Sequence, residues 1–149
     1  MWQWGCEVAQ VINFKLFSPN DLDFYSPDEE VDEVNVEWLQ DKRAYTITYE
    51  DTIICVLYYH ELNKGVLEVA LCKSLIFKDC PVKAMAKFFM QALNHLRKNG
   101  AHRICAVVRG NSPRDLKFIK LLGFKFESIL YSYLKVGEDA HMYVWGGKQ

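Results

Sequence analysis

The stretch Ala70–Phe89, "ALCKSLIFKDCPVKAMAKFF", contains the change of hydrophobic period that decides the fold. An apolar run ends at Ser74, a few mixed residues follow, and Pro81 opens a segment whose apolar side chains recur at helical spacing. A strand, a short loop and a helix N-terminus therefore follow one another, an arrangement in which many proteins bind a phosphate group through backbone N–H groups. This loop contains no glycine. It therefore differs from glycine-rich loops, in which the absence of side chains lets a phosphate approach the backbone N–H groups.

The segments on either side carry strand and helix signals of their own. "AYTITYE" alternates, "TIICVLYYHEL" is rich in β-branched and aromatic residues, and turn residues separate these runs. Ser112 stands at an N-cap position, with Pro113 in the first turn and Asp115 in the capping-box place. The sequence predicts strands over 8–17, 44–50, 52–62, 66–74, 103–109, 124–136 and 141–147, and helices over 81–99 and 113–122.

This order predicts a mixed sheet in an α/β (α+β) fold. Each of the two helices follows one strand and precedes another, so part of the sheet is expected to be parallel and the rest antiparallel. We expect helices on the faces of one sheet, with the strands from Val66 and Arg103 side by side, parallel, and diverging near Cys72.

The chain has 149 residues, which fits a single domain over 1–149. Its net charge of −1 conceals an asymmetry, because the residues through Asp41 hold ten acids and one base. The acids crowd into a segment over 20–41, where we expect short helical pieces broken at Pro27. Three interpretations stay open for it: a solvated segment that covers a basic body, an arm that binds a basic partner, or an acidic wall that receives a cationic amine.

Cysteine and histidine usage indicates a reducing compartment and gives no sign of a metal. The five cysteines are an odd number, lie mostly in apolar segments and include no CxxC pair. We expect five free thiols in a cytoplasmic protein. The four histidines lack ligand spacing, so we expect no metal site. No apolar stretch approaches the roughly 20 residues of a membrane span, and the N-terminus lacks the pattern of a secretory signal.

The order of elements, together with "NSPRDLKFIKLLGF", resembles the GNAT superfamily of acyl-CoA-dependent N-acetyltransferases. The quoted helix looks like the family's Asn-initiated helix, which ends in Leu-Gly-Phe and leads directly into a strand. The topological resemblance covers about residues 44–145, and the motif match is good over 103–127. The resemblance implies a GNAT-like mixed sheet flanked by helices, with acetyl-CoA as the acyl donor.

The resemblance also implies a cofactor site at the opening stretch, with altered chemistry. In the family a glycine-rich turn exposes backbone N–H groups to the pyrophosphate, and the splayed strand before it pairs with the pantetheine arm. Here Lys78 takes the place of the family's Gln or Arg, while Pro81 and Lys83 replace small residues. A proline lacks an N–H group and a lysine adds bulk, so we expect weakened binding. The implied cofactor-binding residues are Leu71, Cys72, Lys73, Lys78, Cys80, Val82, Lys83 and Asn111.

The catalytic residues are also altered. Many family members carry a Tyr on the last helix that protonates the departing thiolate, and here that place is Ile119. Tyr131 or Tyr133 on the following strand could take over this role, although aromatic residues on a strand more often pack in a core. Glu68 could act as a base through water, and a strand Glu that simply faces solvent is the alternative.

Among GNAT-like proteins, the chain is most similar to degenerate members of the internal-virion type from short-tailed bacteriophages. They share a glycine-poor loop and the Lys-Ala opening of the long helix. Two functions follow: acyl transfer to an amine, or a catalytically inactive, virion-associated or host-interacting protein that uses the fold as a scaffold and binds a protein partner. Nucleic-acid binding ranks third, because the many basic residues are not interleaved with aromatic ones. We expect no membrane partner.

Overall fold

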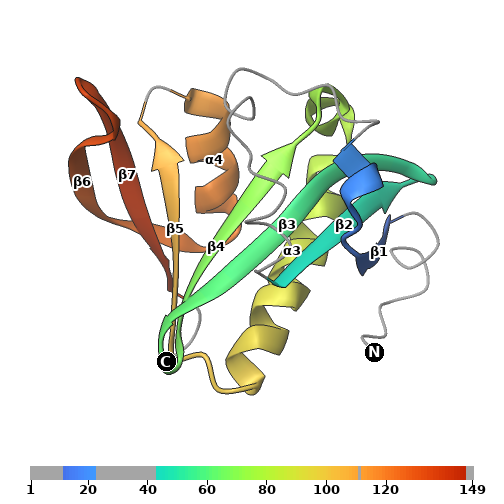
Figure 1. The fold of residues 1–149 in the computed structure, drawn as a ribbon, viewed down its shortest axis with the longest axis horizontal. Helices are drawn as coiled ribbons and strands as arrows, with labels where there is room; N and C mark the ends of the chain where they lie inside the picture. The colour runs from blue at the N-terminus through green and yellow to red at the C-terminus, as the bar shows by residue number, and fades with distance from the viewer. Residues whose placement is uncertain (1–11, 23–42, 111, 147–149) are drawn as a thin grey trace. The chain divides into compact units, whose positions relative to one another are not determined.

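The computed structural model describes residues 12–22, 43–110 and 112–146, and Figure 1 shows how their helices and strands succeed one another. The acidic segment 20–41 and its predicted helical pieces lie outside these residues, apart from Asn20–Leu22. The described strands are β1 (Ile12–Leu16), β2 (Arg43–Tyr49), β3 (Thr52–Asn63), β4 (Val66–Lys73), β5 (Arg103–Arg109), β6 (Phe124–Lys135) and β7 (Glu138–Trp145). The described helices are α3 (Val82–Lys98), α4 (Pro113–Leu121) and the 3-10 helices η1 (Pro19–Leu22) and η2 (Leu75–Asp79).

The strands form a seven-stranded mixed sheet in the order β1-β2-β3-β4-β5-β7-β6. β4 and β5 are parallel, and the pairs β1–β2, β2–β3, β5–β7 and β6–β7 are antiparallel. The prediction of a mixed sheet, with the strands from Val66 and Arg103 parallel, is thus confirmed. β6 lies at one edge of the sheet, where it forms a hairpin with β7 beside β5 (Figure 1).

β4 and β5 pair over only a short stretch. The register runs from Val66↔Arg103 to Glu68↔Cys105, whereas β4 continues to Lys73 and β5 to Arg109. On its other side, β5 pairs with β7 from Cys105 to Arg109. The parallel pairing therefore ends before Cys72, the position at which we had expected the strands to diverge. Just after the end of β4, the N–H of Ser74 donates a 2.9 Å hydrogen bond to the carbonyl of Ile54 on β3. The chain therefore stays beside β3 at this point.

The chain divides into two compact units. Unit 1 comprises residues 1–60 and 70–88, and unit 2 comprises residues 61–69 and 89–149. The division crosses β3, β4 and α3. Each unit therefore contains part of β4, and β5 belongs to unit 2.

Unit 1 has a core between its antiparallel strands and the first half of α3. Ile47 and Val56 are buried on β2 and β3, and Met85 and Phe88 are buried on α3. The rings of Phe14 and Phe88 lie 6.4 Å apart, which joins β1 to the helix. The 3.6-residue spacing of apolar side chains in α3 thus produces the buried face that the sequence predicted.

Unit 2 has one apolar face, which the helices cover. Ile104 on β5 and Tyr143 and Trp145 on β7 are buried. Arg97 near the end of α3 lies 4.6 Å above the ring of Trp145, and Phe89 makes an edge contact of 6.0 Å with Phe118 of α4. Because side chains alternate along a strand, Glu68, Arg103 and Cys105 belong to the opposite face.

The helices and the last strand begin and end near the predicted residues, with some differences. α3 begins one residue after Pro81 and ends in a Schellman motif, in which Gly100 has φ +106° and the N–H of Ala101 reaches the carbonyl of Leu96. Ser112 is the N-cap of α4, but its hydroxyl makes no capping bond, so the capping box is not formed. β7 begins at Glu138, earlier than the predicted 141, because its turn needs only two residues between the strands.

Candidate functional site

The loop that precedes α3 belongs to unit 1 and is folded into the 3-10 helix η2. The sequence did not predict this helix. Cys80 follows it with a buried side chain, and its N–H donates a 3.2 Å hydrogen bond to the carbonyl of Phe77. Its thiol lies 3.5 Å from the carbonyl oxygen of Ile76. Burial, and secondarily the charge of Asp79, raises the pKa of the Cys80 thiol. Cys80 thus closes the loop internally through both its N–H and its thiol.

The backbone at the start of α3 retains hydrogen-bond donors. Pro81 precedes the helix, and its carbonyl accepts the first helical bond, from the N–H of Met85, at 3.0 Å. The N–H groups of Val82, Lys83 and Ala84 therefore have no acceptor within the helix. Proline was expected to remove a donor from this cradle. Pro81, whose carbonyl accepts the first helical bond, stands at the first of the four positions whose N–H groups lack an acceptor in the helix, so three donors remain there.

The side chains around this N-terminus are exposed and basic. Lys78 on η2 and Lys83 on α3 are exposed, and Val82 is 55% exposed. Leu71 and Lys73, on the last part of β4, are half-buried. Three N–H groups and two ammonium groups fit an anion such as a pyrophosphate. The side chain of Cys72, and Asn111 as a whole, lie outside the described residues.

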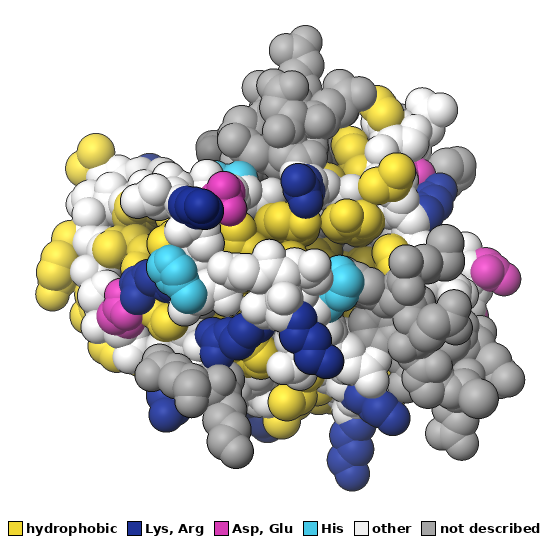
Figure 2. Space-filling model, turned by 90° about the horizontal axis from the view of Figure 1, so that it is seen from below, with side chains coloured by type: hydrophobic (Ala, Val, Ile, Leu, Met, Phe, Trp, Pro, Cys, Tyr) yellow, Lys and Arg dark blue, Asp and Glu magenta, His cyan; other side chains and the backbone are white. Residues whose placement is uncertain are grey.

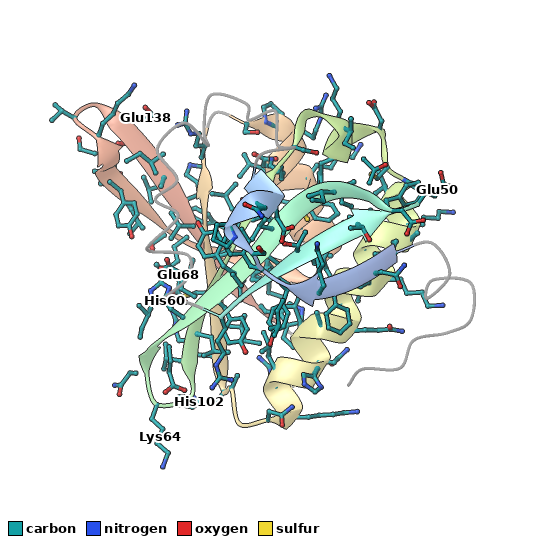
Figure 3. All side chains as sticks on the ribbon, turned by 45° about the vertical axis from the view of Figure 1, so that its right-hand side comes forward. Glu50, His60, Lys64, Glu68, His102 and Glu138 are labelled. Atoms are coloured by element: carbon teal, nitrogen blue, oxygen red, sulfur yellow. The ribbon has the colours of Figure 1, made fainter. Side chains whose placement is uncertain are left out.

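Unit 2 contains two of the predicted catalytic residues, Glu68 and Tyr133. Glu68 lies midway along β4 (Figure 3), half-buried, between the buried side chains of Leu67 and Val69 on the other face. Desolvation, followed by the charges of Glu68 and of Cys105, raises the pKa of the Tyr133 phenol. Glu68 and Tyr133 are far apart in the sequence, yet the charge of Glu68 is the second cause of the raised pKa of Tyr133.

An irregularity of β6 sets the position of Tyr133. The register with β7 shifts between Leu130↔Ala140 and Lys135↔Glu138, so that residues 131–134 bulge from the hairpin. Ser132 in this bulge has φ +50°, its N–H donates a 2.8 Å hydrogen bond to Asp139, and its hydroxyl accepts one from the N–H of Gly137. Tyr131 is 77% exposed on this bulge, and Tyr133 is 55% exposed. Of the two tyrosines on the bulge, Tyr133 is the less exposed, and the charge of Glu68 contributes to its raised pKa.

The side chain of Cys105 belongs to the same face as Glu68, because the two residues are partners in the β4–β5 register. The side chain is buried, and its Sγ is 3.4 Å from the carbonyl oxygen of Leu67. Burial, followed by the charge of Glu68, raises the pKa of this thiol. A buried thiol with a raised pKa contains little thiolate and is a poor nucleophile.

The sequence did not predict an ion pair that lies on the same face. The guanidinium of Arg103 donates two hydrogen bonds to the carboxylate of Glu127, at 3.0 and 2.5 Å. This pair joins β5 to β6, which are not neighbours in the sheet. The hydrogen bond from Arg103 lowers the pKa of Glu127. Only the spacing of Arg103 and Cys105, two residues apart on one strand, could have indicated that they share a face.

Basic side chains are frequent on the surface outside these sites. Figure 2 shows a face on which Lys and Arg side chains (dark blue) are more numerous than Asp and Glu side chains (magenta). This agrees with the basic balance of the chain after Asp41. In the described ranges, no group of three or more His, Cys, Asp or Glu side chains could hold a metal ion. No helix described here is both long and apolar enough to cross a membrane.

Solved structures show which fold this is. No family model and no curated protein matches the sequence. The structure of Ard1 from Thermoplasma volcanium matches with a TM-score of 0.73 and 14% identity, over 90% of this chain and 96% of that one. A GNAT-family acetyltransferase from Bacillus anthracis matches with a TM-score of 0.71 and 11% identity, over 90% and 93%. The chain has the GNAT acetyltransferase fold.

A further match is the N152L mutant of the spermidine N-acetyltransferase SpeG from Vibrio cholerae, with a TM-score of 0.66 and 14% identity, over 91% of this chain and 94% of that one. The predicted GNAT-like sheet flanked by helices is thus confirmed as a fold. At these identities the GNAT likeness carries no activity with it, because one fold hosts many functions. The similarity to bacteriophage proteins stays a prediction.

Proposed function

We propose that this protein is an N-acetyltransferase that transfers an acetyl group from acetyl-CoA to an amine. The observation that carries the proposal is that unit 2 contains a carboxylate and a phenol, Glu68 and Tyr133, and that the charge of Glu68 contributes, after desolvation, to the raised pKa of the phenol. Acyl transfer to an amine needs a group that accepts a proton from the amine and one that donates a proton to the departing sulfur. These two residues have the chemistry for the two roles.

The start of α3 supports the choice of acyl donor. The N–H groups of Val82, Lys83 and Ala84, with the ammonium groups of Lys78 and Lys83, would hold the pyrophosphate of acetyl-CoA. When bound, acetyl-CoA supplies an acetyl group activated as a thioester. Side-chain charge replaces much of the close backbone contact that glycine would allow, so the binding is expected to be weak and sensitive to salt.

The proposed chemistry assigns one proton transfer to each residue. The carboxylate of Glu68 accepts a proton, directly or through water, from the ammonium form of the acceptor, which leaves a nucleophilic amine. The amine forms a C–N bond to the acetyl carbon as the C–S bond breaks, and the new amide nitrogen loses its remaining extra proton to solvent. The phenol of Tyr133 donates its proton to the departing sulfur, and the proton held by Glu68 returns to Tyr133 through solvent. The buried thiol of Cys105 takes no part, so the transfer is direct.

A second candidate is a non-catalytic protein that uses the fold as a scaffold for a protein partner, such as a virion or host protein. The glycine-free loop favours it, because Pro81 and Lys83 stand where small residues would allow an anion to approach. Ile119, at the helix position of the family's usual acid, favours it as well. The two candidates differ in whether acetyl-CoA is consumed.

The deciding experiment is release of free CoA thiol from acetyl-CoA in the presence of a panel of amines, including a polyamine, an aminoglycoside and a peptide with a free N-terminus. Acetyl transfer that depends on protein concentration, and that falls at least a hundredfold in Glu68→Gln, would support the enzyme. An absence of turnover with every amine, together with an absence of acetyl-CoA binding, would favour the scaffold. The three described cysteines outside β4 are buried free thiols, which supports a reducing, cytoplasmic location.

A further inference from the structure

Glu68 and Arg103 lie on the same face of adjacent parallel strands without forming an ion pair. Val66 pairs with Arg103 and Glu68 with Cys105, so Glu68 and Arg103 are diagonal neighbours. Diagonal neighbours on adjacent strands lie roughly 7–8 Å apart, within reach of long side chains. Among the described residues, Glu68 has neither a hydrogen bond nor an ion pair. An arginine so close to a free carboxylate would ordinarily form one.

Glu127 accounts for the absence of this pair. Its two carboxylate oxygens accept two hydrogen bonds from the Arg103 guanidinium, which also lies 3.9 Å from the sulfur of Met142 on β7, and these contacts hold the side chain toward β7 and β6. The side chains of Arg103 and Glu127 are 37% and 43% exposed, so no tight packing fixes them in place. The thiol of Cys105 responds to the charges of Glu68, Arg103 and Glu127, which places all three around one buried group.

We propose that Glu127 is a positioning residue that holds Arg103 away from Glu68 and so keeps the carboxylate of Glu68 free for the acceptor amine. The inference rests on the proposed role of Glu68 as the base. If Arg103 paired with Glu68, its guanidinium would stabilise the ionised carboxylate and occupy the place of the incoming ammonium. A neighbouring arginine lowers the basicity of a carboxylate by roughly tenfold or more.

Removal of Glu127 gives the first test. In Glu127→Gln, the released Arg103 should pair with Glu68, and kcat/KM for acetyl transfer should fall about tenfold or more. Adding Arg103→Gln to this variant should restore the activity, because no guanidinium is left to occupy Glu68. If Glu127 served only to support the strands, the double variant would stay as inactive as the single one, and the proposal would be overturned.

Glu138→Gln is the matched control. Glu138 forms ion pairs of 3.0 Å with Arg109 and 3.3 Å with Lys135, and Figure 3 shows it at the far end of the β6–β7 hairpin from Glu68. The substitution makes the same chemical change in the same hairpin and releases an arginine that is not a neighbour of Glu68. It should leave kcat/KM unchanged. A loss as large as that in Glu127→Gln would show a general weakening of the hairpin and contradict the proposal.

A stability measurement tests the positioning role without any activity. The shifts in melting temperature caused by Glu68→Gln and Arg103→Gln should add in the wild-type protein, because the two side chains do not interact there. In the Glu127→Gln background the same two substitutions should become non-additive. Additivity in both backgrounds, or coupling already in the wild type, would overturn the proposal. If the two substitutions were non-additive only in the Glu127→Gln background, and no amine were acetylated, Glu127 would still be shown to hold Arg103 away from Glu68. The proposed acetyltransferase activity would then be rejected.

Discussion

The carboxylate of Asp21 accepts a 2.6 Å hydrogen bond from the hydroxyl of Thr46, 25 residues further along the chain. Both residues are buried, and Asp21 also receives the N–H of Ser18 at 2.9 Å and the ammonium of Lys15 at 3.0 Å. These contacts join the turn after β1 to β2 in unit 1. Burial alone would raise the pKa of Asp21, but the three partners together lower it below its ordinary value of 3.8.

Asp21→Asn should therefore destabilise the protein. The change leaves partners of a buried carboxylate unsatisfied, so the expected loss is about 1–3 kcal/mol in the free energy of unfolding. For a chain of this size, that loss corresponds to a fall in melting temperature of roughly 5 °C at pH 7. The control is Asp79→Asn, since Asp79 is exposed and should tolerate the change. Equal melting temperatures for Asp21→Asn and the wild type would contradict the account.

The stability that Asp21 provides should depend on pH. Because its pKa is lower in the folded state than in the unfolded state, the ionised carboxylate stabilises the fold at pH values above its unfolded pKa. That contribution is lost as the pH falls through the folded pKa. The difference in melting temperature between the wild type and Asp21→Asn should thus be largest at neutral pH and shrink below about pH 4. A difference that grew on acidification would have the wrong sign.

Tyr133→Phe should reduce acetyl transfer while acetyl-CoA binding stays the same. The substitution keeps the ring and removes the proton that the proposed mechanism donates to sulfur, a contribution of about a hundredfold or more in kcat. Tyr131→Phe is the matched control on the same bulge, because Tyr131 is more exposed and makes no described interaction with Glu68. If the two variants lost the same activity, Tyr133 would not be the acid.

Acetyl-CoA should bind weakly, through charge at the start of α3. A ligand at about 100 times its Kd adds about 2.7 kcal/mol to stability, whereas one near its Kd adds only a few tenths. Millimolar acetyl-CoA should therefore raise the melting temperature only slightly, and added salt should abolish the shift. Lys78→Glu should also remove it. Lys64→Glu, an exposed site in the other unit, is the control, and an equal loss there would indicate non-specific charge attraction.

Most helices and strands can be predicted from local sequence patterns, whereas the arrangement of the candidate site residues cannot. Alternation in "AYTITYE" and helical spacing after Pro81 were sufficient to predict β2 and α3. The helix η2 was missed because "LIFKD" has neither period. The bulge of β6 and the positive φ of Ser132 set the backbone around Tyr133, and a run of β-branched and aromatic residues does not predict them. Long-range register, rather than residue type, sets where the tyrosines of β6 lie.

The described thiols should be unreactive in the native protein. Cys55, Cys80 and Cys105 are free and buried, and the pKa values of Cys80 and Cys105 are raised above the ordinary value. Both effects slow alkylation, because the thiolate is the reactive form. A thiol reagent should therefore modify these three only slowly in the native protein. In denaturant all five cysteines of the chain should react. A denatured count of three or one would reveal disulfides and contradict a reducing compartment.

Cys105→Ser should retain acetyl transfer. The serine hydroxyl can donate to the carbonyl of Leu67 as the thiol does, so the fold and the neighbouring Glu68 keep their places. A direct transfer from acetyl-CoA to the amine needs no acyl–cysteine, and a protein incubated with acetyl-CoA alone should show no added acetyl mass on Cys105. A loss of turnover in Cys105→Ser with an unchanged melting temperature, accompanied by an acetylated Cys105 in the wild type, would replace direct transfer by a covalent route.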